Sequence, residues 1–190
     1  DYVERRFARA GFEPDGPVLL TGVAQRHARG ARAGPVTAFA TVGLSNPATL
    51  PVEPADDGPP RADRPARSGN PDRPPAGTVN VVVLTSRALT EAGAANLLAV
   101  ASEARTATLL ALTGFTGTTS DAAVIGYDPD GELARYTGSA TTVGRAARAC
   151  VRDAIRASFA ARYDDREPPD SVATAAHGAA TTECAEVFEP

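Results

Sequence analysis

The chain has 190 residues, of which 43% are hydrophobic, and its 19 basic and 23 acidic residues give a net charge of -4. This length and apolar content predict one globular domain with a core of its own. Every basic residue is an arginine, so the sequence excludes chemistry that needs a lysine, such as a phosphate-binding P-loop or a Schiff base. The arginines are dispersed among the acids, which argues against nucleic acid as a partner.

Apolar runs and cysteines narrow the class of protein further. No apolar run approaches the roughly 18 residues that span a bilayer, so we expect no membrane partner. Cys150 and Cys184 stand alone, without a CxxC motif or a cysteine–histidine cluster, which indicates neither a disulfide framework nor a zinc site. This cysteine usage fits a cytoplasmic location best.

The first third of the chain predicts a helix, two strands and an insertion. Residues 1–11 place apolar side chains at helical spacing, with Gly11 as the stop. Residues 17–23 and 36–43 alternate like strands, and the arginine-rich segment between them predicts a turn of helix or a hairpin. Eight prolines fall within the 27 residues of the range 51–77, among acidic and arginine residues, so we interpret this range as a mobile insertion.

The middle of the chain predicts a strand–helix–strand crossover. Residues 79–84 form an apolar β-type run, Thr90 can cap a long helix that ends at Gly114, and residues 122–127 form a second apolar run. Such a crossover joins parallel strands. Because open sheets of this kind bind ligands beyond the carboxyl ends of their strands, Thr85, Ser86 and Tyr127 would lie near a ligand.

The last third predicts one more helix and a peripheral tail. The helix follows Gly138, begins near Ser139 or Thr141, and carries an arginine stripe that we interpret as its solvated face. Residues 164–190 are weakly patterned and form a C-terminal extension, with a short edge strand predicted over residues 186–188. The predicted fold is a single α/β domain over residues 1–190, with a mixed or mostly parallel sheet packed by helices and a long proline-rich insertion.

Polar residues that interrupt apolar segments are the first candidate site residues. Ser45 and Asn46 follow the strand at residues 36–43, where they serve either as a turn that caps the strand or as substrate-binding groups. Asn80 lies inside a strand, and a buried amide left without partners costs about 1 to 3 kcal/mol. Asn80 therefore either ties two loops together or binds substrate.

The long helix and the loop after it supply the candidate catalytic residues. Glu103 borders the apolar stripe of the helix, where desolvation would suit a general acid or base, although a surface ion pair is the plainer explanation. The loop at residues 113–121 ends in Asp121 and offers hydroxyl and backbone N–H groups that could bind an oxyanion or an anion. Its candidates are Thr116, Gly117, Thr118 and Thr119.

Histidines offer little support for a metal site. The sequence has two, His27 in the arginine-rich segment and His177 in the tail, and neither belongs to an HxH or HExxH motif. We expect a surface position for His27 and no protein-bound catalytic metal. No GxSxG motif is present, so a familiar triad cannot be identified from the sequence.

Taken together, the ordered segments resemble adenosylcobinamide amidohydrolases, a family of corrinoid-salvage enzymes. Four stretches carry the resemblance in order: VTAFATVGLSNP, GTVNVVVLTSRALTEAGAANLLAVASEARTATL, TGTTSDAAVIG and TGSATTVGRA. They span roughly the middle two thirds of the chain, and their order and spacing make the match specific where each alone would not.

The resemblance implies hydrolysis of the amide that joins the aminopropanol arm to the corrin, releasing adenosylcobyric acid and aminopropanol or its phosphate. Cobalt then belongs to the corrinoid substrate, and no protein cofactor is expected. Residue chemistry suggests Glu103 or Asp121 as base or acid, and Thr118 as an alternative nucleophile. Ser45, Asn46, Asn80, Thr116, Gly117 and Thr119 are the suggested substrate-binding groups. A non-catalytic corrinoid-binding or carrier protein is the alternative, and a homo-oligomer is left open.

Overall fold

A computed structural model describes residues 2–13, 16–52 and 77–189 of the chain. Its centre is a four-stranded sheet in the order β1-β2-β4-β7, formed by β1 (Arg29–Ala33), β2 (Val36–Val42), β4 (Val79–Thr85) and β7 (Ala122–Tyr127). β1, β2 and β4 pair antiparallel, whereas β4 and β7 pair parallel. The sheet is therefore mixed, as the sequence predicted, and the crossover through residues 79–127 is confirmed.

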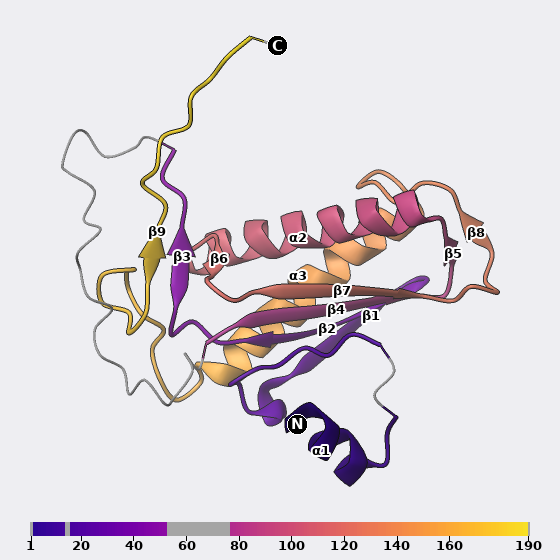
Figure 1. Cartoon of the computed structure of the whole chain (residues 1–190), viewed down its shortest axis with the longest axis horizontal. Helices are drawn as coiled ribbons and strands as arrows, with labels where there is room; N and C mark the ends of the chain where they lie inside the picture. Colours follow the sequence, from indigo (N-terminus) through magenta and orange to yellow (C-terminus); the bar gives the residue numbers. More distant parts are fainter. Residues whose placement is uncertain (1, 14–15, 53–76, 190) are drawn as a thin grey trace.

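Two helices cover one face of this sheet. α2 (Glu91–Thr113) connects β4 to β7, and α3 (Thr142–Arg162) packs beside it over β1 and β2 (Figure 1). Val36, Ala38, Ala40 and Val42 of β2 point into the core beneath these helices, and the alternate residues point to the opposite face. Because side chains alternate along each strand, the sheet has one face buried beneath α2 and α3. The opposite face, which these two helices do not cover, is called the uncovered face below.

The helix boundaries follow from caps that the sequence predicted. Thr90 accepts a hydrogen bond from Gly93 N at 3.0 Å at the start of α2, and Thr141 does the same for Gly144 N at the start of α3. α2 ends at Gly114, whose φ of +75° is the left-handed conformation that terminates helices.

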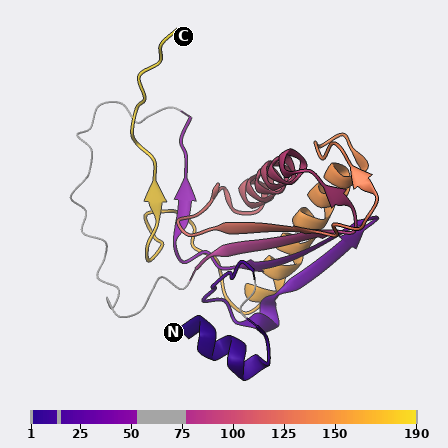
Figure 2. The ribbon, with the colours of Figure 1, turned by 45° about the vertical axis from the view of Figure 1, so that its right-hand side comes forward.

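The N-terminal part of the chain lies on the uncovered side of the sheet. α1 (Tyr2–Ala10) has no buried residue and lies on the side opposite to α2 (Figures 1 and 2). The prediction of a strand at residues 17–23 is wrong: this segment joins no sheet and is held where Leu20 O accepts from Asn80 Nδ2 at 2.8 Å. Its apolar pattern serves to cover part of the sheet instead of extending it.

The arginine-rich segment before β2 holds a 3-10 helix, η1 (Gln25–His27), and the strand β1. Both alternatives for this segment are confirmed: η1 is a turn of helix, and β1 forms a hairpin with β2. The register pairs Gly30 of β1 with Phe39 of β2.

Short strands complete the molecule beside the main sheet. β3 (Pro47–Thr49) lies between β6 (Gly117–Thr118) and β9 (Ala179–Ala180), and β5 (Ala88–Leu89) pairs with β8 (Leu133–Ala134). Among the described residues of the tail, β9 is the strand, and the predicted strand at residues 186–188 is wrong. Residues 53–76, most of the predicted insertion, lie outside the described ranges.

Candidate functional site

Polar side chains gather where the connection from β2 to β3 meets the loop from β6 to β7. We call this group the Asn46 cluster; it comprises Ser45, Asn46, Thr78, Thr118, Thr119, Ser120 and Asp121. It lies beside the amino ends of β4 and β7, at the edge opposite to Thr85 and Tyr127. The strand–helix–strand crossover had predicted a ligand site at the other edge, near Thr85, Ser86 and Tyr127.

Asn46 is the centre of the cluster and is fully buried. Its Nδ2 donates to Thr119 Oγ1 at 2.7 Å and to Ser120 Oγ at 3.1 Å, and its backbone O accepts from Thr119 N at 3.1 Å. Asn46 therefore ties two segments that are 73 residues apart in sequence. Its Oδ1 has no hydrogen-bond partner among the described residues.

Ser45 Oγ is a second buried oxygen, besides Asn46 Oδ1, for which the described residues supply no hydrogen-bond partner. Both atoms face Gly77, because a Cβ added to Gly77 would stand 2.4 Å from each of them. Buried polar atoms nearly always find a partner, so an unpaired couple in this place needs an explanation. An acceptor and a hydroxyl side by side complement the N–H group of an amide.

Asp121 is the buried anion of the cluster, with a side chain that is 6% exposed. Its carboxylate accepts from Val79 N at 2.8 Å, from Thr118 N at 2.9 Å and from Thr118 Oγ1. Arg105 Nε lies 3.7 Å from Oδ2, which is beyond hydrogen-bond length, so Arg105 contributes charge and no hydrogen bond. A hydroxyl that donates to an oriented carboxylate has the geometry of an activated nucleophile, and the same contacts also anchor the loop.

The loop N–H groups that were expected to hold an oxyanion already donate within the protein. Thr118 N donates to Asp121, Thr119 N to Asn46 O, and Thr116 N and Oγ1 both to Ala48 O at 3.0 and 2.9 Å. Gly117 pairs with Ala48 in the ladder of β3 and β6. These residues shape the loop in this conformation, and their predicted contacts with substrate remain a prediction.

Asn80 connects the cluster to the uncovered face of the sheet. Its Oδ1 accepts from Thr78 Oγ1 at 3.3 Å, while Thr78 Oγ1 also donates to Ser120 O at 2.8 Å. Its Nδ2 holds Leu20 O, so Asn80 does tie two segments together. Asn80 also lines a hollow of about 300 Å³ on the sheet face.

Glu103 is not brought to the cluster. Its side chain is 58% exposed and forms an ion pair with Arg148 of α3 at 2.5 Å. Arg105, two residues further along α2, is the residue that points to Asp121. The exposed carboxylate lacks the desolvation on which its predicted catalytic role depended.

Two polar residues, His27 and Thr41, are buried although the sequence did not predict it. His27 is buried, with its Nδ1 2.8 Å from Ala161 O, so the expected surface position is wrong. Its arginine neighbours suggested solvent, but packing of η1 against α3 buries the ring. Thr41 of β2 is also buried, and its Oγ1 has no hydrogen-bond partner within the described ranges. An alternating strand gives no signal that one of its threonines lines a hollow.

Within the described residues, no three or more histidine, cysteine or acidic side chains come together in a group that could hold a metal ion. No helix there is long and apolar enough to cross a membrane.

The buried carboxylate of Asp121, which accepts from the Thr118 hydroxyl, is a group that could take up a proton in a hydrolytic reaction. Comparison with known proteins specifies the class. Residues 1–167 match the sequence family described as adenosylcobinamide amidohydrolase, and the chain belongs to that family. A protein of Halobacterium salinarum named adenosylcobinamide amidohydrolase is 57% identical over 192 residues, which cover all of this chain and 78% of that protein. No solved structure matches the chain.

Proposed function

We propose that this protein hydrolyses the amide bond of adenosylcobinamide, giving adenosylcobyric acid and aminopropanol or its phosphate in the salvage of cobalamin precursors. The observation that carries the proposal is 57% identity, across the entire chain, with a protein that bears the name of this activity. The match covers all of this chain, so it includes every segment that builds the Asn46 cluster.

Amide hydrolysis requires a nucleophile, a group that accepts its proton, and a proton for the departing amine. The pair formed by Thr118 and Asp121 supports one route. Thr118 Oγ attacks the carbonyl carbon and gives its proton to Asp121, and the C–N bond then breaks as Asp121 passes that proton to the amine. Water hydrolyses the resulting ester and restores the Thr118 hydroxyl. In the second route Asp121 takes the proton from a water molecule that attacks the carbonyl carbon, then passes that proton to the amine as the C–N bond breaks, and no ester forms.

The free oxygens of Ser45 and Asn46 support a role in holding the substrate amide through its N–H group. Asn80 lines the hollow on the sheet face, so its side-chain amide is a further group that could bind the substrate. Thr116, Gly117 and Thr119 enter the proposal as the residues that hold the loop around Thr118. Glu103 stays a candidate acid or base only if the substrate reaches the side of α2 that faces α3.

A chromatographic assay with adenosylcobinamide tests the proposal. Adenosylcobyric acid should appear in proportion to enzyme, whereas tight binding of intact adenosylcobinamide without product would mark a carrier protein and refute the proposal. Thr118→Val should lower kcat by about 10²- to 10⁴-fold, the usual contribution of a positioned catalytic group, while Thr118→Ser retains the hydroxyl and much of the rate.

The matched comparison is Glu103→Gln, which removes an exposed carboxylate outside the cluster. Equal losses in Thr118→Val and Glu103→Gln would count against the Asn46 cluster as the site. Trapping of a corrinoid ester on wild-type protein would select the route through Thr118 over the route through water.

The proposal includes no resident metal or organic cofactor, since cobalt arrives with the corrinoid. Activity should therefore persist after dialysis against a chelator. The two cysteines are both free thiols, which supports a cytoplasmic location. A homo-oligomer remains open, and sedimentation of the purified protein would decide it.

A further inference from the structure

The uncovered face of the main sheet carries two large, exposed apolar side chains, Phe39 and Leu84, which we call the apolar floor. Phe39 of β2 lies over Gly30 of β1, because a Cβ on Gly30 would stand 3.0 Å from the Phe39 ring. Leu84 of β4 lies over Gly126 of β7 in the same way, with 2.7 Å between Leu84 Cδ2 and a Cβ on Gly126. Each of these two side chains therefore lies across to the neighbouring edge strand and contacts a glycine there.

Packing of a large side chain over a strand glycine also stabilises a sheet, so this arrangement needs a second observation before it indicates a ligand. Phe39 remains 47% exposed and Leu84 42% exposed. They stand on the same face: Phe39 pairs with Val82 in the middle of β4, and Leu84 lies near the carboxyl end of β4, away from the cluster. Phe39 also lines the hollow of about 300 Å³ on this face, which distinguishes it from an isolated exposed residue.

Polar atoms lie at one end of the floor. Thr41 is paired with Asn80 across β2 and β4, and both line the hollow of about 300 Å³, together with Phe39, Val82 and Gln25. Thr41 is 8% exposed, and within the described part of the chain its Oγ1 has no hydrogen-bond partner. A buried hydroxyl in a hollow, without a partner in the protein, is free to bind a polar group of a ligand.

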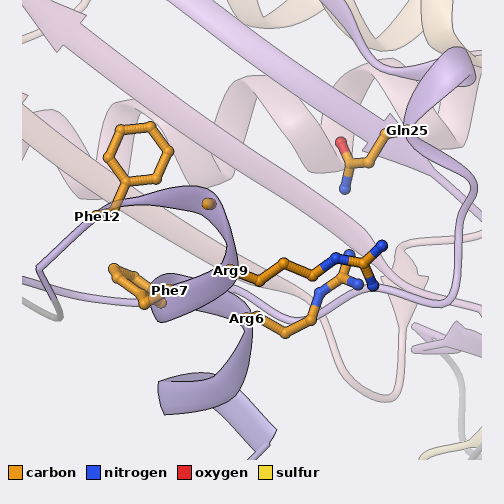
Figure 3. Close-up of a pocket in the computed structure, with 6 residues that line it drawn as sticks. Arg6, Phe7, Arg9, Phe12 and Gln25 are labelled. Atoms are coloured by element: carbon orange, nitrogen blue, oxygen red, sulfur yellow. The ribbon is translucent and has the colours of Figure 1, made fainter.

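A larger hollow of about 760 Å³ adjoins the first through Gln25. α1 forms its outer wall with Arg6, Phe7 and Arg9, and Phe12 follows the helix (Figure 3). Figure 3 shows the guanidinium groups of Arg6 and Arg9 extending toward Gln25, and the two phenylalanine rings on the other side. The hollow thus combines aromatic rings with hydrogen-bond donors.

We propose that the corrin ring of the substrate binds on this uncovered sheet face, over Phe39 and Leu84 and beneath α1. This inference rests on the proposed function. A corrin is a broad, nearly flat apolar ring with an edge of amide side chains, so it needs a flat apolar floor with polar groups at its margin. Ligand hollows of about 300–1,000 Å³ suit drug-sized molecules. A corrinoid is larger and needs both hollows.

Asn80 links the proposed corrin site to the Asn46 cluster. It lines the hollow and accepts from Thr78, which in turn contacts the loop that carries Thr118 and Asp121. A ring on the sheet face can therefore direct its aminopropanol arm along Asn80 toward the cluster. The corrin is held on one side of Asn80, and the amide is cleaved on the other.

The groove between α2 and α3 is the competing location. It measures about 470 Å³ and is lined by Arg145, Arg148 and Arg152 together with alanines. Of the buried polar atoms that lack partners in the described chain, none belongs to a residue of this groove, and Glu103 already pairs with Arg148. No residue of the Asn46 cluster lines it either. The sheet face is favoured because it alone joins exposed apolar surface to an unpartnered hydroxyl and to the cluster.

Substitutions on the two faces of the molecule test the placement. Phe39→Gln should weaken the binding of adenosylcobyric acid, measured by equilibrium dialysis with detection of corrin absorbance, by about tenfold or more, as expected for losing the contact of one large apolar side chain. The same variant should raise KM for adenosylcobinamide while changing kcat much less. Leu110→Gln on α2 is the matched control, since Leu110 is 45% exposed on the opposite layer of the fold, and it should bind like wild type.

Gly126→Ala provides a second variant in case Phe39→Gln perturbs folding. The new Cβ meets only the flexible end of the Leu84 side chain, so the fold should adjust while the floor becomes uneven and binding weakens. The placement is wrong if both Phe39→Gln and Gly126→Ala bind within twofold of Leu110→Gln. Wild-type protein that neither binds nor cleaves the corrinoid would instead overturn the proposed function, and the placement with it.

Discussion

Replacement of Asp121 by asparagine tests how far the buried carboxylate supports the loop as well as the chemistry. Asp121 offers both oxygens to N–H donors, Val79 N and Thr118 N. An asparagine keeps one acceptor oxygen and turns an NH₂ group toward the other donor, which leaves one buried N–H unsatisfied. That loss costs about 1–3 kcal/mol.

The change also removes the negative charge beside Arg105, whose side chain is 17% exposed. Breaking a fully buried ion pair costs about 3–5 kcal/mol, and this pair is longer than a hydrogen bond and not fully buried, so we take about 1 kcal/mol. The expected total is about 2–4 kcal/mol off the free energy of unfolding.

Urea unfolding followed by circular dichroism measures this loss, with Asp164→Asn as the control because Asp164 is exposed. A decrease below about 0.5 kcal/mol in Asp121→Asn, equal to that of the control, would refute the hydrogen-bond reasoning, since surface changes usually stay within that range. Turnover should be measured well below the midpoint of unfolding. A large fall in kcat in protein that is still folded then reports on chemistry, and not on stability.

Three further predictions concern single residues. Gly77→Ala should abolish activity and lower the midpoint of thermal unfolding, because its Cβ would stand 2.5 Å from a backbone nitrogen as well as against two side-chain oxygens; unchanged activity would show that these oxygens are not part of the site. A thiol reagent should modify Cys184 in native protein and Cys150 only after unfolding, because Cys150 is buried and burial raises the pKa of its thiol; two thiols titrated at once in native protein would contradict this. Burial also raises the pKa of Tyr163, whose hydroxyl oxygen accepts from Leu44 N at 2.9 Å. The stability that the protonated Tyr163 side chain contributes is therefore complete below the pKa of about 10 that tyrosine has in the unfolded chain. It is lost as pH rises through the higher pKa of the folded state. Tyr163→Phe should therefore cost about 1 kcal/mol at neutral pH and reduce the fall in stability above pH of about 10, and an unaltered pH profile would exclude Tyr163 as its source.

Local patterns predicted the central elements well. The crossover from β4 through α2 to β7 and the caps at Thr90 and Thr141 are confirmed, because alternation, helical periodicity and capping depend on residues within a few positions of each other. The segment at residues 17–23 has the same alternation, yet it forms no strand. What places this segment against the sheet face is a contact with a residue far along the chain, the hydrogen bond from Asn80 Nδ2 to Leu20 O, which local alternation does not encode.

The candidate site was predicted in part. Asn46 and Asn80 were selected because they interrupt apolar segments, and Thr118 and Asp121 because they belong to a glycine- and threonine-rich loop before a strand. The structure brings all four into one connected group. Glu103 was selected by its position on a helix face, and its partner on α3 lies 45 residues away in sequence. A helix pattern shows that a residue borders an apolar stripe, but it does not show which neighbour will pair with it.

The sequence by itself determined the family, the mixed α/β character and the polar residues from which the candidate site is built. These depend on residue identity and local spacing, which the chain carries in any conformation. Only the tertiary structure decided that Gly77 lies against two unpaired oxygens, that His27 is buried, and that Phe39 and Leu84 form a floor on the uncovered sheet face. Each of these depends on register and packing between segments far apart in sequence, because a strand has two faces and only its neighbours decide what each face meets.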